Sequence, residues 1–294
     1  MKKVTLNDFL KGINFTDNQF DDFWKLGNAT SLSEDTKGQK LEFYRGPLLY
    51  ALISYLKPKK ILEYGTGGGY STLCMAKALS DLKIDGKIYT IDRVGNKEKI
   101  SRFYQLPEDK QPQKMTISNY EIWKKVTRSE VIDKIIPIQG YSGIVMDKTE
   151  LNQIDFCYVD GNHSYEGTKH DFLSFLQVAS NNFAVLFDDY IDRDFYGVKK
   201  FVDKEINPKY DSVLIDSDPE KELEQFVKED LDYGMVYFKH KSNNSILDNY
   251  DKNEINLFLK QYRNNDYRVR ARRYNIERKI PFLKNIKFKF WKKN

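Results

Sequence analysis

Two apolar segments of the sequence end in acidic residues that could do chemistry together. Asp160 ends one segment, His163 follows three positions later, and Asp188 and Asp189 end another. If the two segments are parallel strands of one sheet, their ends meet at the same edge. Carboxylates gathered there repel one another unless a hard divalent cation lies between them. The pattern predicts metal ligands at Asp160, Asp188 and Asp189, with His163 suited to accept a proton.

A glycine-rich stretch forms a second candidate site. Residues 63–69 read EYGTGGG and directly follow an apolar segment. The spacing does not fit the dinucleotide fingerprint, because Tyr70 or Thr72 stands where the third glycine is required, and the Lys-Ser/Thr pair of a phosphate loop is missing. A carboxylate at Glu63 disfavours a pyrophosphate and favours a cationic amino acid group. Asp92 ends the next apolar segment, where an acid can bind two ribose hydroxyls.

These residues need strands and helices to position them. Near-continuous apolar character predicts buried strands, and the segments between them are compatible with helices. The expected strands are 60–64, 87–92, 135–139, 154–160, 183–189, 211–216 and 234–240, and the expected helices lie at 41–56, 71–82, within 95–133, 165–178 and 197–206. This alternation predicts parallel strands joined by crossovers. We therefore expect an α/β fold with a doubly wound, seven-stranded, mostly parallel (Rossmann-like) sheet.

The two ends of the chain differ from its centre. Residues 1–45 are expected to form an N-terminal helical cap, residues 46–241 the ligand-binding domain, and residues 242–294 a basic, aromatic C-terminal extension. Residues 261–294 hold twelve Lys and Arg against two acidic residues, so the rest of the chain carries −5 although the whole carries +5. This mildly acidic body does not suit a nucleic-acid partner.

The composition excludes several classes of protein. With 40% hydrophobic and 31% charged residues, the chain can bury a core and is not disordered throughout. The best apolar run, residues 47–56, is about half of what a membrane span needs, and the N-terminus lacks a signal-peptide pattern. Cys74 and Cys157 are expected to be buried apolar residues, and His170 and His240 to be solvated. A cytoplasmic location is expected.

The motif Glu-x-Gly-x-Gly-x-Gly, followed by an acid at the second strand end, resembles the class I S-adenosylmethionine-dependent methyltransferases. In that family the glycine loop passes beneath the methionine portion of the cofactor and the acid binds its ribose. Residues 140–143, GYSG, resemble the adenine-side loop of the family. The resemblance implies S-adenosylmethionine as cofactor, with these binding residues: Glu63, Gly65, Thr66, Gly67, Gly69, Asp92 and Ser142.

A second motif narrows the resemblance. The sequences DGNHSYEG (160–167) and DDY (188–190), with Asp171 and Gly197-Val198, are similar to a bacterial branch of metal-assisted O-methyltransferases. This implies methylation of a hydroxyl on a small molecule or glycan, with catalytic Asp160 and His163 and with Mg²⁺ on Asp160, Asp188 and Asp189. Residues 1–45 are then expected to cover the acceptor pocket. The catechol-type enzymes differ, with Lys in place of His163 and Asn in place of Asp189.

The basic extension leaves other hypotheses open. Residues 268–294 could contact the inner face of an anionic membrane as a peripheral anchor, or bind RNA phosphates. They could also simply pack on the domain or on a second copy in a homodimer. Two further functions therefore stand beside O-methylation: a methyltransferase of RNA or protein recruited by this extension, and a non-catalytic scaffold that kept the fold.

Overall fold

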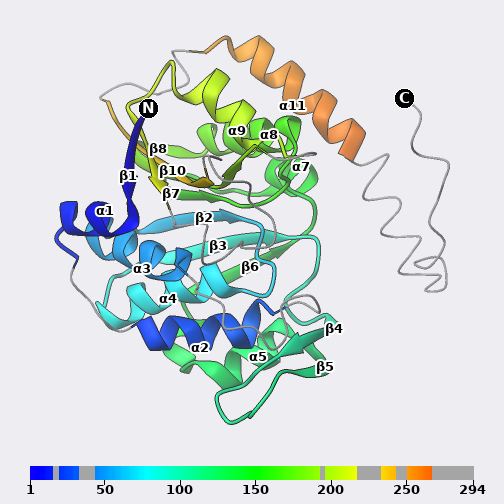
Figure 1. Cartoon of the computed structure of the whole chain (residues 1–294). Helices are drawn as coiled ribbons and strands as arrows, with labels where there is room; N and C mark the ends of the chain where they lie inside the picture. The colour runs from blue at the N-terminus through cyan, green and yellow to red at the C-terminus, as the bar shows by residue number, and fades with distance from the viewer. Residues whose placement is uncertain (16–19, 33–43, 193–195, 217–232, 243–249, 267–294) are drawn as a thin grey trace.

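The computed structural model describes residues 1–15, 20–32, 44–192, 196–216, 233–242 and 250–266. One large sheet runs through these residues in the order β1-β9-β10-β8-β7-β2-β3-β6 (Figure 1). Its strands are β1 (Lys2–Thr5), β2 (Lys60–Tyr64), β3 (Lys87–Asp92), β6 (Ile135–Gln139), β7 (Ile154–Val159), β8 (Ala179–Ile191), β9 (Ser212–Asp216) and β10 (Tyr233–Lys241). The prediction of a doubly wound, mostly parallel sheet is confirmed, with eight strands in place of seven.

The centre of the sheet explains where a ligand can bind. Strand β2 pairs in parallel with β3 on one side and with β7 on the other. The chain therefore leaves β2 toward β3 and β6, and later returns to the opposite side to form β7 and β8. At such a reversal the loops that follow the two central strands diverge and leave a crevice. The loops after β2 and β7 carry the two predicted motifs.

Helices cover both faces of this sheet (Figure 1). Helices α2 (Phe20–Thr30), α3 (Arg45–Leu56) and α4 (Tyr70–Asp81) form one apolar core with one set of strand residues, including Ile61 and Phe156. Helices α8 (Tyr165–Leu176), α9 (Val198–Phe201), its π-helical continuation η2 (Val202–Ile206) and α11 (Lys252–Asp266) form a second core with the alternate residues, including Leu62 and Cys157. Burial on both faces is what the continuous apolar strands predicted.

The eighth strand lies in the segment expected to be purely helical. Residues Lys2–Thr5 pair in parallel with β9, and Lys3 forms a 3.2 Å ion pair with Asp216. Thr5 then caps α1 (Leu6–Gly12) through its side-chain oxygen, which accepts from the main-chain N–H of Asp8. The strand was missed because four residues without a regular apolar pattern become a strand only through pairing with a distant segment.

The prediction of helix within 95–133 is only partly right. Residues 99–118 form an antiparallel hairpin of β4 (Lys99–Tyr104) and β5 (Gln113–Ser118), which is a separate two-stranded sheet. Helix α5 (Asn119–Val126) follows directly, because Ser118 and Glu121 exchange hydrogen bonds in a capping box. A short helix α6 (Ser129–Ile132) leads back to β6. The β-branched and aromatic residues of the hairpin favour strands.

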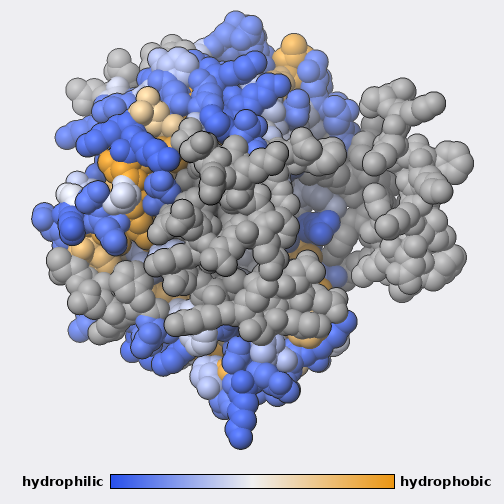
Figure 2. All heavy atoms as spheres, in the orientation of Figure 1, coloured by the Kyte–Doolittle hydropathy of each residue, from blue (hydrophilic) through white to orange (hydrophobic). Residues whose placement is uncertain are grey.

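The face shown in Figure 2 is mostly hydrophilic over the residues that the structure describes. Five large apolar side chains among them are exposed, namely Met1, Tyr55, Leu82, Ile136 and Leu257. Within the described ranges, none of the helices combines the length and the apolar character that crossing a bilayer requires. Residues 268–294, for which membrane or RNA contact was considered, lie outside the described residues.

Candidate active site

The glycine loop joins β2 to α4 in a backbone shape that depends on its glycines. Gly65, Gly67 and Gly69 have φ angles of 93°, 55° and 98°, a region that residues with a Cβ adopt only at a cost. A Cβ on Gly65 would also collide with the main-chain carbonyl of Asp160, and one on Gly69 would collide with the indole of Trp123. The loop is therefore packed tightly between the segment after β7 and helix α5.

Helix α5 holds the glycine loop through two side chains. The Asn119 side-chain amide donates to the carbonyl of Gly67 at 2.8 Å, and the Trp123 indole N–H donates to the carbonyl of Gly68 at 3.0 Å. Trp123 is almost fully buried. These bonds fix the carbonyls, so that the main-chain N–H groups of the loop keep a defined direction. Neither residue was singled out from the sequence, because α5 is distant from the loop along the chain.

Glu63 lies beneath this loop and is fully buried. Its two carboxylate oxygens accept hydrogen bonds from the hydroxyls of Ser71 and Thr72 in the first turn of α4. Burial raises the pKa of Glu63, and the two hydroxyl donors oppose part of that rise. The carboxyl group thus fastens the start of α4 to the end of β2. The pair Ser71-Thr72, which begins two positions after Gly69, was the signal in the sequence that could have shown this.

Asp92 lies at the end of β3 and faces the glycine loop. One carboxylate oxygen accepts from the N–H of Gly67 at 2.9 Å, and the other accepts from the N–H of Val94 at 2.8 Å. A cavity of about 490 Å³ opens beside it, lined among others by Thr66, Asn96 and Gln139. Asp92 can therefore present its carboxylate to a ligand from a fixed position.

A second cavity, of about 330 Å³, lies on the other side of Asp92. The glycine loop lines one wall and Asp160 and His163 line another, while Thr66 and Asp92 border both cavities. Cavities of this size accommodate small-molecule ligands and cofactors. The structure thus brings the two motifs predicted from the sequence to one crevice.

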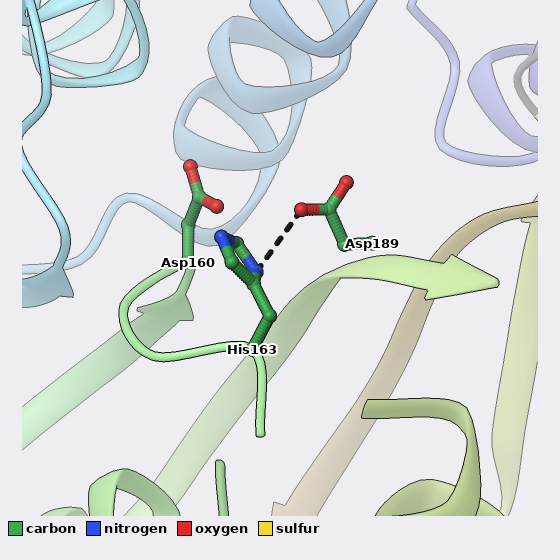
Figure 3. Close-up of side chains that lie close together, drawn as sticks. All are labelled: Asp160, His163 and Asp189. Carbon is green, nitrogen blue, oxygen red and sulfur yellow. Dashed lines mark ion pairs between the residues drawn. The ribbon is translucent and has the colours of Figure 1, made fainter. Parts of the chain in front are cut away.

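Three groups that could carry out chemistry converge at the end of this crevice: Asp160, His163 and Asp189 (Figure 3). The imidazole of His163 lies between the two carboxyl groups, and its Nδ1 is 3.0 Å from an oxygen of Asp189. The ring of Tyr196 stacks on the imidazole with centroids 5.0 Å apart. Asp189 has a φ of 52°, an unfavourable angle for a residue other than glycine. Such strain is concentrated at functional sites.

Asp160 is surrounded by other acids. Burial, followed by the charges of Asp188 and Asp189, raises its pKa well above the ordinary value, and Arg45 opposes the rise only in part. A carboxyl group in this position holds its proton unless a positive charge comes close. The site is therefore one where a cation or a cationic ligand changes the protonation of the protein.

Asp188 is engaged in other contacts. It is almost fully buried, it accepts from the hydroxyl of Tyr158 at 2.6 Å, and it lies 3.1 Å from the Nε of Arg45. The group whose ligand atoms lie within 4.8 Å of one another consists of Asp160, His163 and Asp189. In the structure, His163 rather than Asp188 forms a possible ligand group with Asp160 and Asp189. From the sequence, His163 was predicted as the base and Asp188 as the third metal ligand.

Two oxygens and one imidazole nitrogen fit a divalent transition metal or Mg²⁺ as a partial ligand set. The acidic crowding at Asp160 agrees with this fit, because a cation would relieve the repulsion among the carboxylates. The same geometry also fits a metal-free pair in which Asp189 orients His163.

Ser142, predicted on the adenine side, faces a different part of the molecule. It begins the short helix α7 (Ser142–Val145), and its hydroxyl donates to Asp171 of α8 at 2.7 Å. It is not among the residues that line either cavity beside Asp92. The expectation that His170 is solvated is wrong, because His170 is buried and lies 2.9 Å from Asp171. His240 is partly exposed, and Cys74 and Cys157 are buried and unpaired as expected.

Comparison with known proteins assigns the part of the chain that carries this site to a family. Residues 62–190 match the family model of a methyltransferase domain. The solved structure of cofactor-bound Rv0187 from MTB aligns with a TM-score of 0.50 and 16% identity, covering 81% of this chain and 97% of that one. An O-methyltransferase from Bacillus cereus in complex with SAH aligns with a TM-score of 0.49 and 15% identity, covering 81% and 97%.

A search of curated protein sequences finds no match. At 16% identity the likeness to Rv0187 shows the fold alone, and the domain match supplies the class of enzyme. The chain therefore carries a methyltransferase domain, which extends from β2 into β8. The resemblance to methyltransferases that the sequence motifs indicated is confirmed at the level of this family.

Proposed function

We propose that this protein transfers a methyl group from S-adenosylmethionine to a hydroxyl oxygen of a small molecule or glycan. The observation that carries the proposal is the 330 Å³ cavity, which has the glycine loop on one wall and Asp160 and His163 on another. A methyl donor lying along the loop would direct its sulfonium group toward a proton acceptor.

The two joined cavities suit the two halves of the cofactor. The adenosine would occupy the 490 Å³ cavity, with Asp92 accepting from its ribose hydroxyls. The methionine portion would lie over Gly65 and Gly67 in the smaller cavity. The Asp92 carboxylate is already held by two main-chain N–H groups, so little ordering is needed when the cofactor binds.

For the transfer, the acceptor hydroxyl must lose its proton before or while its oxygen attacks the methyl carbon. The acceptor oxygen forms a bond to the methyl carbon, the carbon–sulfur bond breaks, and its electron pair stays on sulfur as the thioether of S-adenosylhomocysteine. The hydroxyl proton would pass to His163, and Asp189 would stabilise the resulting imidazolium through the 3.0 Å contact at Nδ1. In-line alignment of oxygen, carbon and sulfur supplies much of the acceleration.

In the alternative arrangement a divalent ion would be held by Asp160, His163 and Asp189, and His163 would then be a ligand rather than the base. The ion would supply a positive charge that lowers the pKa of the acceptor hydroxyl. In this arrangement Asp188 supports the site from behind, through Arg45 and Tyr158. Dialysis against EDTA, followed by addition of Mg²⁺ or Mn²⁺, tests the requirement. Unchanged turnover after EDTA would leave His163 and Asp189 as the working pair.

Calorimetric titration with S-adenosylmethionine tests the proposal at its first step. The purified protein should bind the cofactor, and Asp92→Ala should bind it about tenfold to hundredfold more weakly, since a hydrogen bond to a charged group is worth about 1.5–3 kcal/mol. Asp85→Ala is the matched control. Asp85 is exposed and precedes the start of β3, whereas Asp92 lies at the end of that strand. Absence of binding in the parent protein would favour the non-catalytic scaffold.

The acceptor is tested with methyl-labelled cofactor and a set of catechols, phenols and sugars. Label should appear on a hydroxyl oxygen of one of these compounds. Transfer only to added RNA or protein, with none to the small acceptors, would contradict the proposal and favour the recruited methyltransferase.

A further inference from the structure

We propose that Tyr262 of α11 is a positioning residue that holds the loop carrying Asp160 and His163 in its reactive arrangement. The inference rests on the proposed function and concerns a helix beyond the matched methyltransferase domain, which ends at residue 190. It was not foreseen from the sequence, where residues 242–294 were taken together as an extension.

Helix α11 is docked firmly enough to position another element. Its residues Ile255, Phe258, Leu259 and Tyr262 have the spacing of one helical face. Ile255 is buried in the second core, and Phe258 and Leu259 pack against that core. The helix contacts both α8 and α7, which follow β7 and β6 respectively. Figure 1 shows it lying across the helices on this side of the sheet.

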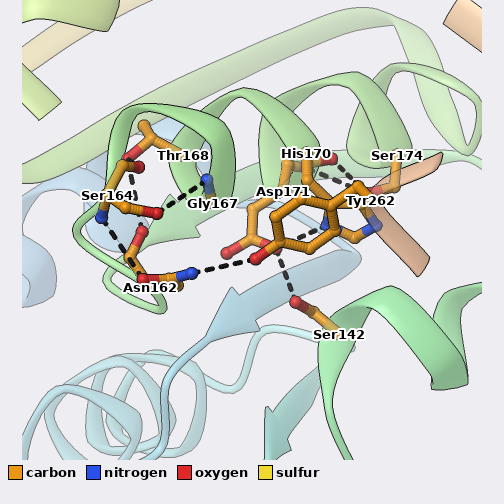
Figure 4. Close-up of polar contacts among 9 residues, drawn as sticks. All are labelled: Ser142, Asn162, Ser164, Gly167, Thr168, His170, Asp171, Ser174 and Tyr262. Carbon is orange, nitrogen blue, oxygen red and sulfur yellow. Dashed lines mark hydrogen bonds and ion pairs between the residues drawn. The ribbon is translucent and has the colours of Figure 1, made fainter. Parts of the chain in front are cut away.

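Tyr262 contacts the catalytic loop directly (Figure 4). Its hydroxyl oxygen accepts a 2.9 Å hydrogen bond from the side-chain amide of Asn162. Asn162 stands between Asp160 and His163 in the sequence, so this bond fixes the middle of the loop. The Tyr262 ring also stacks on His170, with centroids 4.4 Å apart and an interplanar angle of 21°. The tyrosine therefore has a fixed ring and a directed hydroxyl.

The residues that pack against the Tyr262 ring also connect to the loop after β6. His170 lies 2.9 Å from Asp171, and the same Asp171 oxygen accepts from Ser142 of α7. The other oxygen of Asp171 lies so close to Gly161 that a Cβ there would not fit. This set is not a nucleophilic triad, because the acid, rather than the histidine, lies between the other two groups. Its geometry serves to hold the loops after β6 and β7 together.

The contacts that the structure describes for His163 come from β8 and the segment after it. The imidazole is about one-third exposed and is held by Asp189 and by the Tyr196 ring. The main-chain carbonyl of His163 accepts a hydrogen bond from the Gly197 N–H. Two of these partners, Tyr196 and Gly197, come from the segment after β8. A displacement of about 1 Å in a catalytic group can cost about a hundredfold in rate. The Asn162–Tyr262 bond anchors the loop from the opposite side.

Nuclear magnetic resonance of the three histidine imidazoles tests the proposal without needing an acceptor. Tyr262→Phe keeps the ring and removes the hydroxyl. Asn162→Ala removes the same bond from the other end, together with the 3.3 Å bond that the Ser164 N–H donates to Asn162. Each should displace the His163 imidazole resonances, and the double variant should displace them no further than Asn162→Ala alone. The affinity for S-adenosylhomocysteine should stay within twofold of the parent value. With the acceptor from the screen, kcat should fall about tenfold to hundredfold.

Tyr250→Phe is the matched control, because its hydroxyl bonds Tyr210 at 2.8 Å just before the same helix. It should leave the His163 resonances unchanged. Unchanged His163 resonances in both Tyr262→Phe and Asn162→Ala would overturn the proposal, as would an equal displacement in the control. If Tyr262→Phe does not fold, unchanged His163 resonances in Asn162→Ala overturn the proposal. Failure of the parent to bind cofactor would reject the proposed function but leave this resonance test intact.

Discussion

At the scale of single residues, the site is an acidic cluster with an imidazole in its middle. Asp160 and Asp189 lie on either side of His163, and Asp188 lies behind them, bound to Arg45 and Tyr158. Keeping so many carboxyl groups together is unfavourable for the folded protein unless something positive binds there. The cluster therefore lowers stability in favour of function, as active sites commonly do.

The raised pKa of Asp160 has a direct consequence for stability. The folded state holds a proton that the unfolded chain releases near pH 3.8, so stability falls as the pH rises above that value. Asp160→Asn should therefore stabilise the ligand-free protein at pH 7, and do so less at pH 4. Urea unfolding at both pH values measures this. An equal effect at the two pH values would contradict the expectation.

Removal of the proposed base should separate chemistry from binding. His163→Ala is expected to lower kcat about a hundredfold to ten-thousandfold, the usual contribution of general base catalysis. Cofactor affinity should stay close to that of the parent, because His163 lies at the far wall of the cavity. Initial rates and calorimetry provide the two measurements. His240→Ala, on strand β10, is the control and should keep full turnover.

The sequence was sufficient to bring Asp92, the glycines, Asp160 and His163 to one crevice, because parallel strand ends share an edge. It was insufficient for the partners of these residues. Arg45 reaches Asp188 from α3, and Asn119 reaches the glycine loop from α5. Such pairs depend on how helices pack across the sheet, for which a single sequence carries no local pattern. The metal ligands, the base and the acceptor stay predictions.

At the scale of elements, the glycine loop is shaped as much by its neighbours as by its own residues. Helix α5 holds two of its carbonyls, and Glu63 holds the helix that follows it. The strands 60–64, 87–92 and 135–139 were predicted with their observed bounds, because buried parallel strands have a clear apolar signature. The hairpin 99–118 was missed because its half-exposed strands lack the continuous apolar character of the buried ones.

Gly69→Ala tests the fit between this loop and α5. The new Cβ would meet the Trp123 indole at a position where φ is already 98°. We expect a loss of about 1–3 kcal/mol of unfolding free energy, in the range of overpacked sites, and weaker cofactor binding. Urea unfolding and calorimetry measure the two effects. Gly12→Ala, where a Cβ meets nothing within 4 Å, should cost far less, and a similar loss there would argue against the steric explanation.

At the scale of the whole molecule, the two cavities share Thr66 and Asp92 and are lined by elements from both halves of the sheet. Residues from the loops after β2, β3 and β7 and from the end of β6 line them, so a bound cofactor would connect elements far apart in the sequence. The predicted division into 1–45, 46–241 and 242–294 stays a prediction. Strand β1 joins the large sheet and α11 packs on its helices, so parts of both terminal segments are integrated with the central one.

Cofactor binding should therefore stabilise the whole protein against heat. At a hundredfold excess of ligand over Kd, binding adds about 2.7 kcal/mol, which corresponds to a rise in Tm of about 5 °C or more for a chain of this kind. Differential scanning fluorimetry with S-adenosylhomocysteine measures the shift. Asp92→Ala at the same ligand concentration should show a smaller rise. A flat response of the parent protein would speak against the proposed cavity.

The packing of α11 determines which C-terminal truncations keep the bond between Tyr262 and Asn162. The basic residues from 268 onward begin only a few positions after Tyr262 and Arg263, and Arg263 forms an ion pair with Asp147 beside α7. A truncation that starts at residue 261 would remove the charged tail and the anchor of the catalytic loop together. Its lost turnover would then be mistaken for lost recruitment, whereas a stop codon after Asp266 separates the two.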